Sequence, residues 1–110
     1  MQSDKQLVHW YHRYNREWFN GELPADTILY WEPPPDSHAD TCPVYEVADG
    51  KFEIRLDPAL KGVPDYWKIL LLHEMAHLKL WPTHSRHQHG KIFQEEMQRL
   101  ALAGAMKTLW

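Results

Sequence analysis

Two histidines and a glutamate stand close together in the run His73-Glu74-Met75-Ala76-His77. On an α-helix, residues four positions apart lie on the same face, with Cβ atoms about 5–6 Å apart. His73 and His77 can therefore offer two imidazoles to one metal ion. Glu74, beside His73, can reach a water molecule on that ion without being a ligand itself. Two histidine ligands with an adjacent glutamate base are typical of zinc peptidases.

A catalytic zinc ion takes a third protein ligand and keeps one position open. The metzincin spacing would place a histidine six residues after His77, but that position is Thr83. The remaining candidates are three histidines, or a glutamate as in a thermolysin-like site: His84, His87, His89, Glu95 and Glu96. We favour His89, because it directly precedes Gly90, a compact residue that lets the backbone approach the site closely.

The other polar residues near this motif have more ordinary interpretations. We expect His84 and His87 to be loop residues that line the cleft. We expect Glu95 and Glu96 to lie on a solvated or partly exposed helix face, where one of them can orient a ligand histidine. Peptide hydrolysis also uses a second electrophile, and the sequence leaves four candidates open: Tyr45, Tyr66, Arg86 and His87.

The first element that must position this chemistry is an N-terminal helix, predicted over residues 3–20. Ser3 and Gln6 have the spacing of a capping box, and Asn20-Gly21 is a helix stop. Between them, apolar residues recur every three or four positions and predict one buried face: Leu7, Trp10, Tyr11, Tyr14 and Trp18.

A small sheet is predicted next. Residues 27–32 form a β-branched and aromatic run that Pro33-Pro34-Pro35 ends, and residues 33–43 are expected to be an exposed loop. Residues 44–48 and 51–56 flank Asp49-Gly50, which predicts a hairpin.

Two further helices follow. Pro64-Asp65 is expected to open the helix that carries the HExxH motif, which runs to about Leu80 and is apolar on most sides. After a histidine-rich loop, a last helix is predicted over about residues 91–107, with one apolar face: Phe93, Met97, Leu100, Ala101 and Gly104.

The combination of His73-Glu74-Met75-Ala76-His77 with His89-Gly90-Lys91-Ile92-Phe93 resembles the SprT-like metallopeptidase family, which includes the eukaryotic protease Spartan. The family signature is HExxH followed by HGxxF. The resemblance implies that His73, His77 and His89 bind one Zn²⁺ ion and that Glu74 is the catalytic acid/base. It also implies an α+β fold, a minimal zincin-like metalloprotease domain. This would contain an N-terminal helix, a small mainly antiparallel sheet with a hairpin, the active-site helix and a C-terminal helix.

Composition limits the remaining possibilities. The 110 residues fit a single domain over residues 1–110, and the net charge of −3 lacks the basic footprint of a nucleic-acid-binding protein. Larger family members carry a cysteine zinc ribbon or a basic region, whereas Cys42 is the only cysteine here. Direct DNA binding is therefore not expected, although a partner can bring the domain to DNA. Without a signal-peptide core or a membrane span, we expect a cytoplasmic monomer.

Three functions follow from these observations. The first is a zinc-dependent endopeptidase acting on protein or peptide substrates, with Glu74 as general acid/base. The second is a catalytically silent zinc-binding adaptor of the same fold, which would have no use for Glu74. The third is a DNA-associated module that acts on DNA-bound proteins, which the negative charge disfavours.

Overall fold

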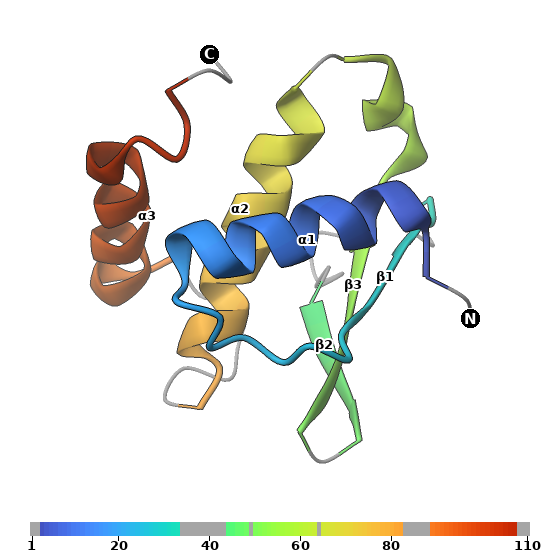
Figure 1. Ribbon diagram of the computed structural model, residues 1–110, viewed down its shortest axis with the longest axis horizontal. Coiled ribbons are helices and arrows are strands. Elements are labelled where there is room, and N and C mark those ends of the chain that lie inside the picture. Colours follow the sequence, from blue (N-terminus) through green and yellow to red (C-terminus); the bar gives the residue numbers. More distant parts are fainter. Residues whose placement is uncertain (1–2, 34–43, 49, 64, 83–88, 108–110) are drawn as a thin grey trace.

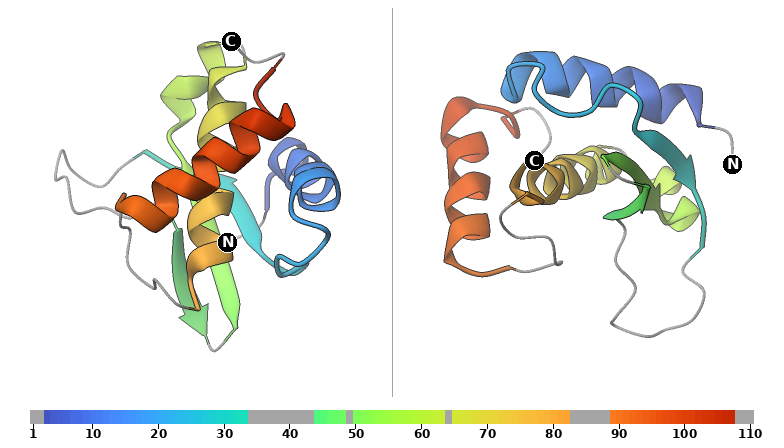
Figure 2. Two further views of the ribbon diagram at one scale, coloured as in Figure 1. Left: turned by 90° about the vertical axis from the view of Figure 1, so that its left-hand side faces the viewer. Right: turned by 90° about the horizontal axis from the view of Figure 1, so that it is seen from below.

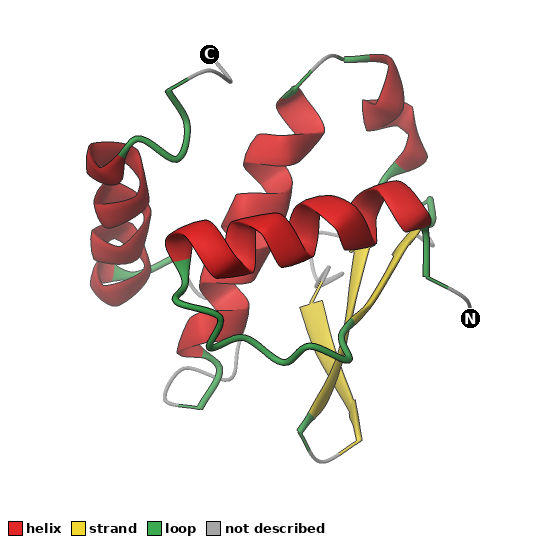
Figure 3. Cartoon of the chain, in the orientation of Figure 1, coloured by secondary structure: helices red, strands yellow, loops and turns green. Residues whose placement is uncertain are grey.

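The computed structural model describes residues 3–33, 44–48, 50–63, 65–82 and 89–107. Its elements confirm the predicted α+β class; Figure 1 shows their order along the chain, and Figure 3 distinguishes the helices from the strands. They are α1 (Lys5–Trp18), β1 (Ile28–Trp31), β2 (Val44–Ala48), β3 (Lys51–Leu56), the 3-10 helix η1 (Pro58–Gly62), α2 (Tyr66–Leu80) and α3 (Lys91–Ala103). No helix within these ranges is both long and apolar enough to cross a membrane.

The sheet is mixed, whereas the sequence analysis expected it to be mainly antiparallel. Its strand order is β1-β3-β2, in which β1 runs parallel to β3 and β2 runs antiparallel to it. The hairpin has the predicted bounds, with an irregularity in register between Glu46 and Ala48. A parallel pairing needs a connection of about a dozen residues or more. The segment from residue 32 to residue 50 is long enough to return the chain to the side of β1.

Helix α1 begins at Lys5 and ends at Trp18, inside the predicted range. Asp4, not Ser3, is its N-cap: the Leu7 N–H donates to Asp4 Oδ1 at 3.0 Å. The Ser3 hydroxyl instead accepts the Leu29 N–H at 3.1 Å. The capping-box prediction was therefore wrong, because a strand brought into contact by the tertiary fold takes the Ser3 oxygen.

The other two long helices also differ from their predicted bounds. Helix α2 begins at Tyr66, because Asp65 has a φ of 65° and does not continue a right-handed helix. Helix α3 stops at Ala103 instead of near residue 107, because Gly104 adopts the left-handed C-cap conformation with a φ of 99°. Ala101, predicted on the apolar face, is exposed.

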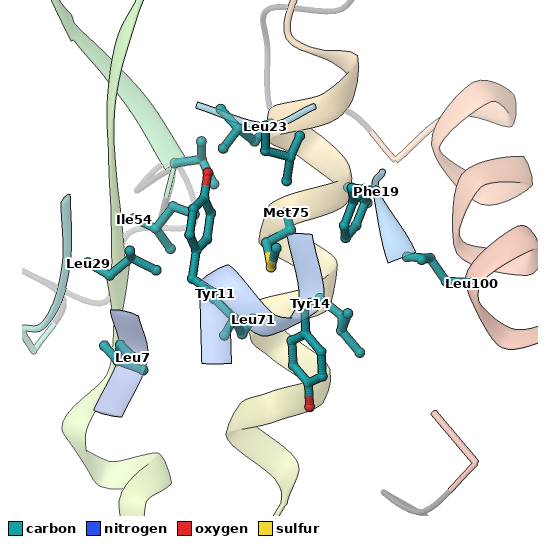
Figure 4. Close-up of a cluster of buried hydrophobic side chains, with 14 of the residues drawn as sticks. Leu7, Tyr11, Tyr14, Phe19, Leu23, Leu29, Ile54, Leu71, Met75 and Leu100 are labelled. Carbon is teal, nitrogen blue, oxygen red and sulfur yellow. The ribbon is translucent and has the colours of Figure 1, made fainter. Parts of the chain in front are cut away.

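The core lies around α2, which passes between the sheet and α3 while α1 crosses it (Figure 2). Figure 4 shows side chains from all of these elements meeting in one cluster. Leu71 and Met75 of α2 are fully buried there, together with Tyr11 of α1, Ile54 of β3 and Leu100 of α3. The prediction of α2 as the central helix is confirmed, because apolar residues on most of its sides find partners.

Buried polar groups fix the turn between α1 and β1. The Asn15 side chain donates to the Leu23 carbonyl at 3.1 Å and accepts the Leu23 N–H at 3.0 Å. It therefore pairs with both backbone groups of Leu23, as a neighbouring strand would. The Tyr11 hydroxyl donates to the Pro24 carbonyl at 2.7 Å. Burial is the main cause that raises the pKa of Tyr11 to about 12, and the phenol therefore stays a donor at neutral pH.

We expect Asn15→Ala to lower the free energy of unfolding by about 2–3 kcal/mol, because it leaves both peptide groups of Leu23 unsatisfied in a buried turn. Urea unfolding followed by tryptophan fluorescence measures this difference. Gln6→Ala, an exposed position on the same helix, is the control and should change stability by less than about 0.5 kcal/mol. Equal effects of the two substitutions would contradict the role assigned to Asn15.

Candidate metal centre

His73 and His77 lie one turn apart on the same face of α2. Their Nε2 atoms are 3.2 Å apart, and their ring centroids are 4.9 Å apart. His77 is 3% exposed, whereas His73 is partly exposed. The pair is therefore anchored in the core on one side and open to solvent on the other. The predicted helical context of the HExxH motif is confirmed.

His89 completes the group from a different element, two residues before α3 begins at Lys91. Its Nε2 atom is 3.1 Å from that of His73 and 3.2 Å from that of His77. Across the described residues, these three side chains form the group of potential ligands whose donor atoms lie within 4.8 Å of one another. The tertiary structure thus brings together the three histidines that the sequence analysis selected.

The three nitrogens fit a tetrahedral ion. Ligands at the usual His–zinc distance of about 2.0–2.1 Å stand roughly 3.3 Å from each other in a tetrahedron, close to the 3.1–3.2 Å separations here. Each neutral imidazole nitrogen either carries a proton or offers a lone pair, never both. Three Nε2 atoms therefore cannot satisfy all three of their mutual contacts with hydrogen bonds. One cation that accepts three lone pairs removes this conflict, so the group can hold a metal ion.

Phe93 forms an apolar wall against all three histidines. Its ring stacks on His77 with a centroid distance of 4.1 Å and an interplanar angle of 12°. The ring centroids of His73 and His89 lie 4.8 Å and 4.9 Å from that of Phe93. Because Phe93 is itself buried, it restricts the rotation of each imidazole. The sequence analysis placed Phe93 on the apolar face of the helix and in the HGxxF element, but it assigned Phe93 no contact with the histidines.

Glu74 is buried at 4% exposure, in the helical turn that carries His73. Among the described residues, it is not a member of the group whose ligand atoms lie within 4.8 Å of one another. Its expected role as a base acting on water stays a prediction.

Glu96 and Glu95, the alternative ligands, lie elsewhere. Glu95 is exposed, with its Oε1 atom 4.0 Å from Lys91 Nζ. Glu96 was expected on a solvated or partly exposed face, but it is buried at 7% exposure. That expectation was wrong, because cations from two helices surround its carboxylate.

The Glu96 carboxylate links all three long helices. It accepts from Lys79 Nζ of α2 at 2.9 Å and from Arg99 of α3 through Nε at 2.8 Å and Nη2 at 2.7 Å. Arg99 Nη2 also donates to the carbonyl of Trp18, the last residue of α1, at 3.0 Å. Burial raises the pKa of Glu96, but the hydrogen bonds and charges of Arg99 and Lys79 outweigh it and hold the pKa below 4.5. The i,i+3 spacing of Glu96 and Arg99 was the only sequence signal for this network.

Several predicted residues cannot be placed. Thr83, His84, Arg86, His87 and the Tyr45 side chain lie outside the described residues. Tyr66 is described and exposed at the start of α2. It precedes His73 by seven residues, which is about 10 Å along the helix axis. The second electrophile therefore stays an open prediction.

Comparison with known proteins agrees with this geometry. The family model described as the SprT-like family matches residues 7–108, nearly the whole chain and both elements that carry the histidines. No curated protein and no solved structure gave a match.

We expect Phe93→Leu to weaken zinc binding about tenfold or more, because groups that orient metal-binding histidines typically contribute that much to affinity. Competition with a chromophoric chelator measures the Kd of the folded protein. Leu100→Ala is the control: it also truncates a buried side chain of α3, but Leu100 lies about 10 Å further along the helix axis than Phe93. An equal loss of affinity in both variants would mean that Phe93 acts only through general stability.

We expect Glu96→Gln to lower the free energy of unfolding at pH 7 by about 1–3 kcal/mol, allowing for the partial exposure of Lys79 and Arg99. Because the folded-state pKa is lowered, the stabilisation is present above about pH 4.5 and disappears as the pH falls through the folded-state value. Urea unfolding of metal-free protein at pH 7 and pH 3 should show the difference from wild type shrinking at acid pH. The exposed neighbour change Glu95→Gln should have little effect at either pH.

Proposed function

The chain belongs to the SprT-like family, and from this membership and the convergence of three imidazole nitrogens we propose that it is a zinc-dependent metallopeptidase. The observation that carries the proposal is the triangle of Nε2 atoms at 3.1–3.2 Å from His73, His77 and His89. Three neutral nitrogen ligands leave one position of a tetrahedral ion open, which is the composition of a catalytic site and not of a closed structural one.

His73, His77 and His89 would hold the ion, and Phe93 would fix their rings. A bound zinc ion would act as a Lewis acid. It would polarise the scissile carbonyl and make a water molecule acidic enough to react near pH 7. The Glu74 carboxylate accepts a proton from the attacking water as the new C–O bond forms. It then delivers this proton to the amine nitrogen as the C–N bond breaks, so that acid and amine products leave with the proton balanced.

The substrate class that we propose is a protein or peptide in an extended conformation. Strand β2 is paired with β3 on one side and, within the described part of the chain, with no strand on the other. As an outer strand of the described sheet, β2 can pair with an extended segment, as in other cases of β-strand addition. Val47 on this strand is 48% exposed and available to contact such a segment.

A catalytically silent zinc-binding adaptor would share the histidine site. The burial of Glu74 in the turn of His73 favours the enzyme, because burying an ionisable carboxylate is costly and a structural site gains nothing from it. An adaptor would also keep its function when Glu74 is neutralised, whereas an enzyme would not.

We expect Glu74→Gln to keep about one zinc per chain and to lose nearly all hydrolysis of an unfolded protein substrate, because it removes the proton acceptor only. His89→Ala should lose both zinc and hydrolysis. Elemental analysis and a gel-based cleavage assay measure the two properties on proteins purified side by side. Zinc with no cleavage in wild type would favour the adaptor, and full activity of Glu74→Gln would refute the proposed mechanism.

A further inference from the structure

Helix α3 is joined to α2 by an ion pair as well as by the histidine cluster. Lys79 Nζ of α2 donates to Glu96 Oε1 of α3 at 2.9 Å, where the two helices cross (Figure 2). Lys79 follows His77 by two residues, and Glu96 follows His89 by seven. The ion pair and the metal centre therefore bridge the same two segments of the chain.

These two contacts hold α3 from different sides of α2. Two residues along an α-helix correspond to a rotation of about 200°, so His77 and Lys79 project from nearly opposite sides of α2. On α3, Phe93 stacks on His77, and Glu96, three residues later, binds Lys79. A contact on one side alone would leave α3 free to rotate about its own axis against α2. Contacts on both sides oppose this rotation.

A rotation of α3 would move His89, because the backbone of His89 is bonded to the first turn of this helix. Gln94 Nε2 donates to the His89 carbonyl at 3.3 Å, and the Gln94 N–H donates to the Gly90 carbonyl at 3.0 Å. A preorganised site needs its ligands within about 0.5 Å of their working positions. Small changes in the docking of α3 are therefore sufficient to weaken metal binding.

Arg99 prepares the Glu96 carboxylate for this contact. Its Nε and Nη2 atoms donate to the two carboxylate oxygens at 2.8 Å and 2.7 Å, and Nη2 also donates to the Trp18 carbonyl at 3.0 Å. Isolated ion pairs contribute little, partly because two long side chains must be ordered. Here the carboxylate is already fixed, so Lys79 is the side chain that remains to be ordered.

We propose that Glu96 and Lys79 are positioning residues of the metal centre, because their ion pair holds α3 on α2 in the orientation that brings His89 to the other two histidines. The ion pair should then increase metal affinity. By thermodynamic linkage, a bound metal ion should strengthen the ion pair by the same factor. This inference rests on the metal centre of the proposed function but not on its peptidase activity.

Lys79→Met separates positioning from charge, because the two predict opposite effects. Loss of a positive charge would by itself leave Zn²⁺ binding unchanged or make it tighter. Loss of positioning should raise the Kd for Zn²⁺ about threefold to fivefold, which is the range that a partly exposed ion pair can supply. Competition with a chromophoric chelator measures this Kd. Glu96 keeps Arg99 as its partner in the variant, so the substitution leaves no buried charge unpaired.

The visible absorption of Co²⁺ bound to the protein gives a second measurement, because it depends on the geometry of the ligands. Lys79→Met should change the position or intensity of the Co²⁺ bands relative to wild type. Lys79→Arg keeps a cation that can bind Glu96, and it should restore both the wild-type spectrum and the wild-type Kd.

Two control variants accompany these measurements. Lys91→Met also removes a lysine two residues after a metal-binding histidine, but the Lys91–Glu95 pair lies within α3 and does not dock it. Asn15→Ala weakens the turn between α1 and β1 and so tests for an effect of general stability. Neither control should raise the Kd for Zn²⁺ of the folded protein or change the Co²⁺ spectrum.

Zn²⁺ binding by Lys79→Met that is as tight as in wild type, or tighter, would overturn this inference and leave the metallopeptidase proposal intact. An equal loss in Lys91→Met or Asn15→Ala would have the same consequence, as would a failure of Lys79→Arg to restore binding. A wild-type protein that binds neither Zn²⁺ nor Co²⁺ would overturn both proposals.

Discussion

Three imidazole nitrogens that point at one another at 3.1–3.2 Å are the constraint around which this structure is organised. They cannot satisfy all three of their mutual contacts by hydrogen bonds, so the fold must hold them together in an arrangement that a cation can stabilise. Two of the three come from one turn of α2 and need only a stable helix. The third, His89, comes from the start of a separate helix. The site therefore exists only if α3 is docked on α2 in one position.

Two sets of contacts determine that position. Near the site, the Phe93 ring lies against all three histidines. The docking of α3 on α2 therefore also fixes the orientation of the three imidazole rings. One turn further along α3, Glu96 binds Lys79 of α2 and Arg99, and Arg99 reaches the last carbonyl of α1. The fully buried Leu71 and Met75 hold α2 between the sheet and the other helices. Rigid support of this kind is what a preorganised metal site requires.

The sequence alone determined whatever depends on near neighbours in the chain. The four-residue spacing of His73 and His77, the amphipathic α1 and the hairpin over residues 44–56 each follow from local periodicity or turn chemistry. The HGxxF resemblance also led to His89. Only the tertiary structure decided the parallel pairing of β1 with β3, the loss of Ser3 as a cap and the burial of Glu96. Each of these depends on partners distant in sequence, because a hydrogen bond or ion pair between two elements leaves no periodic pattern in either one.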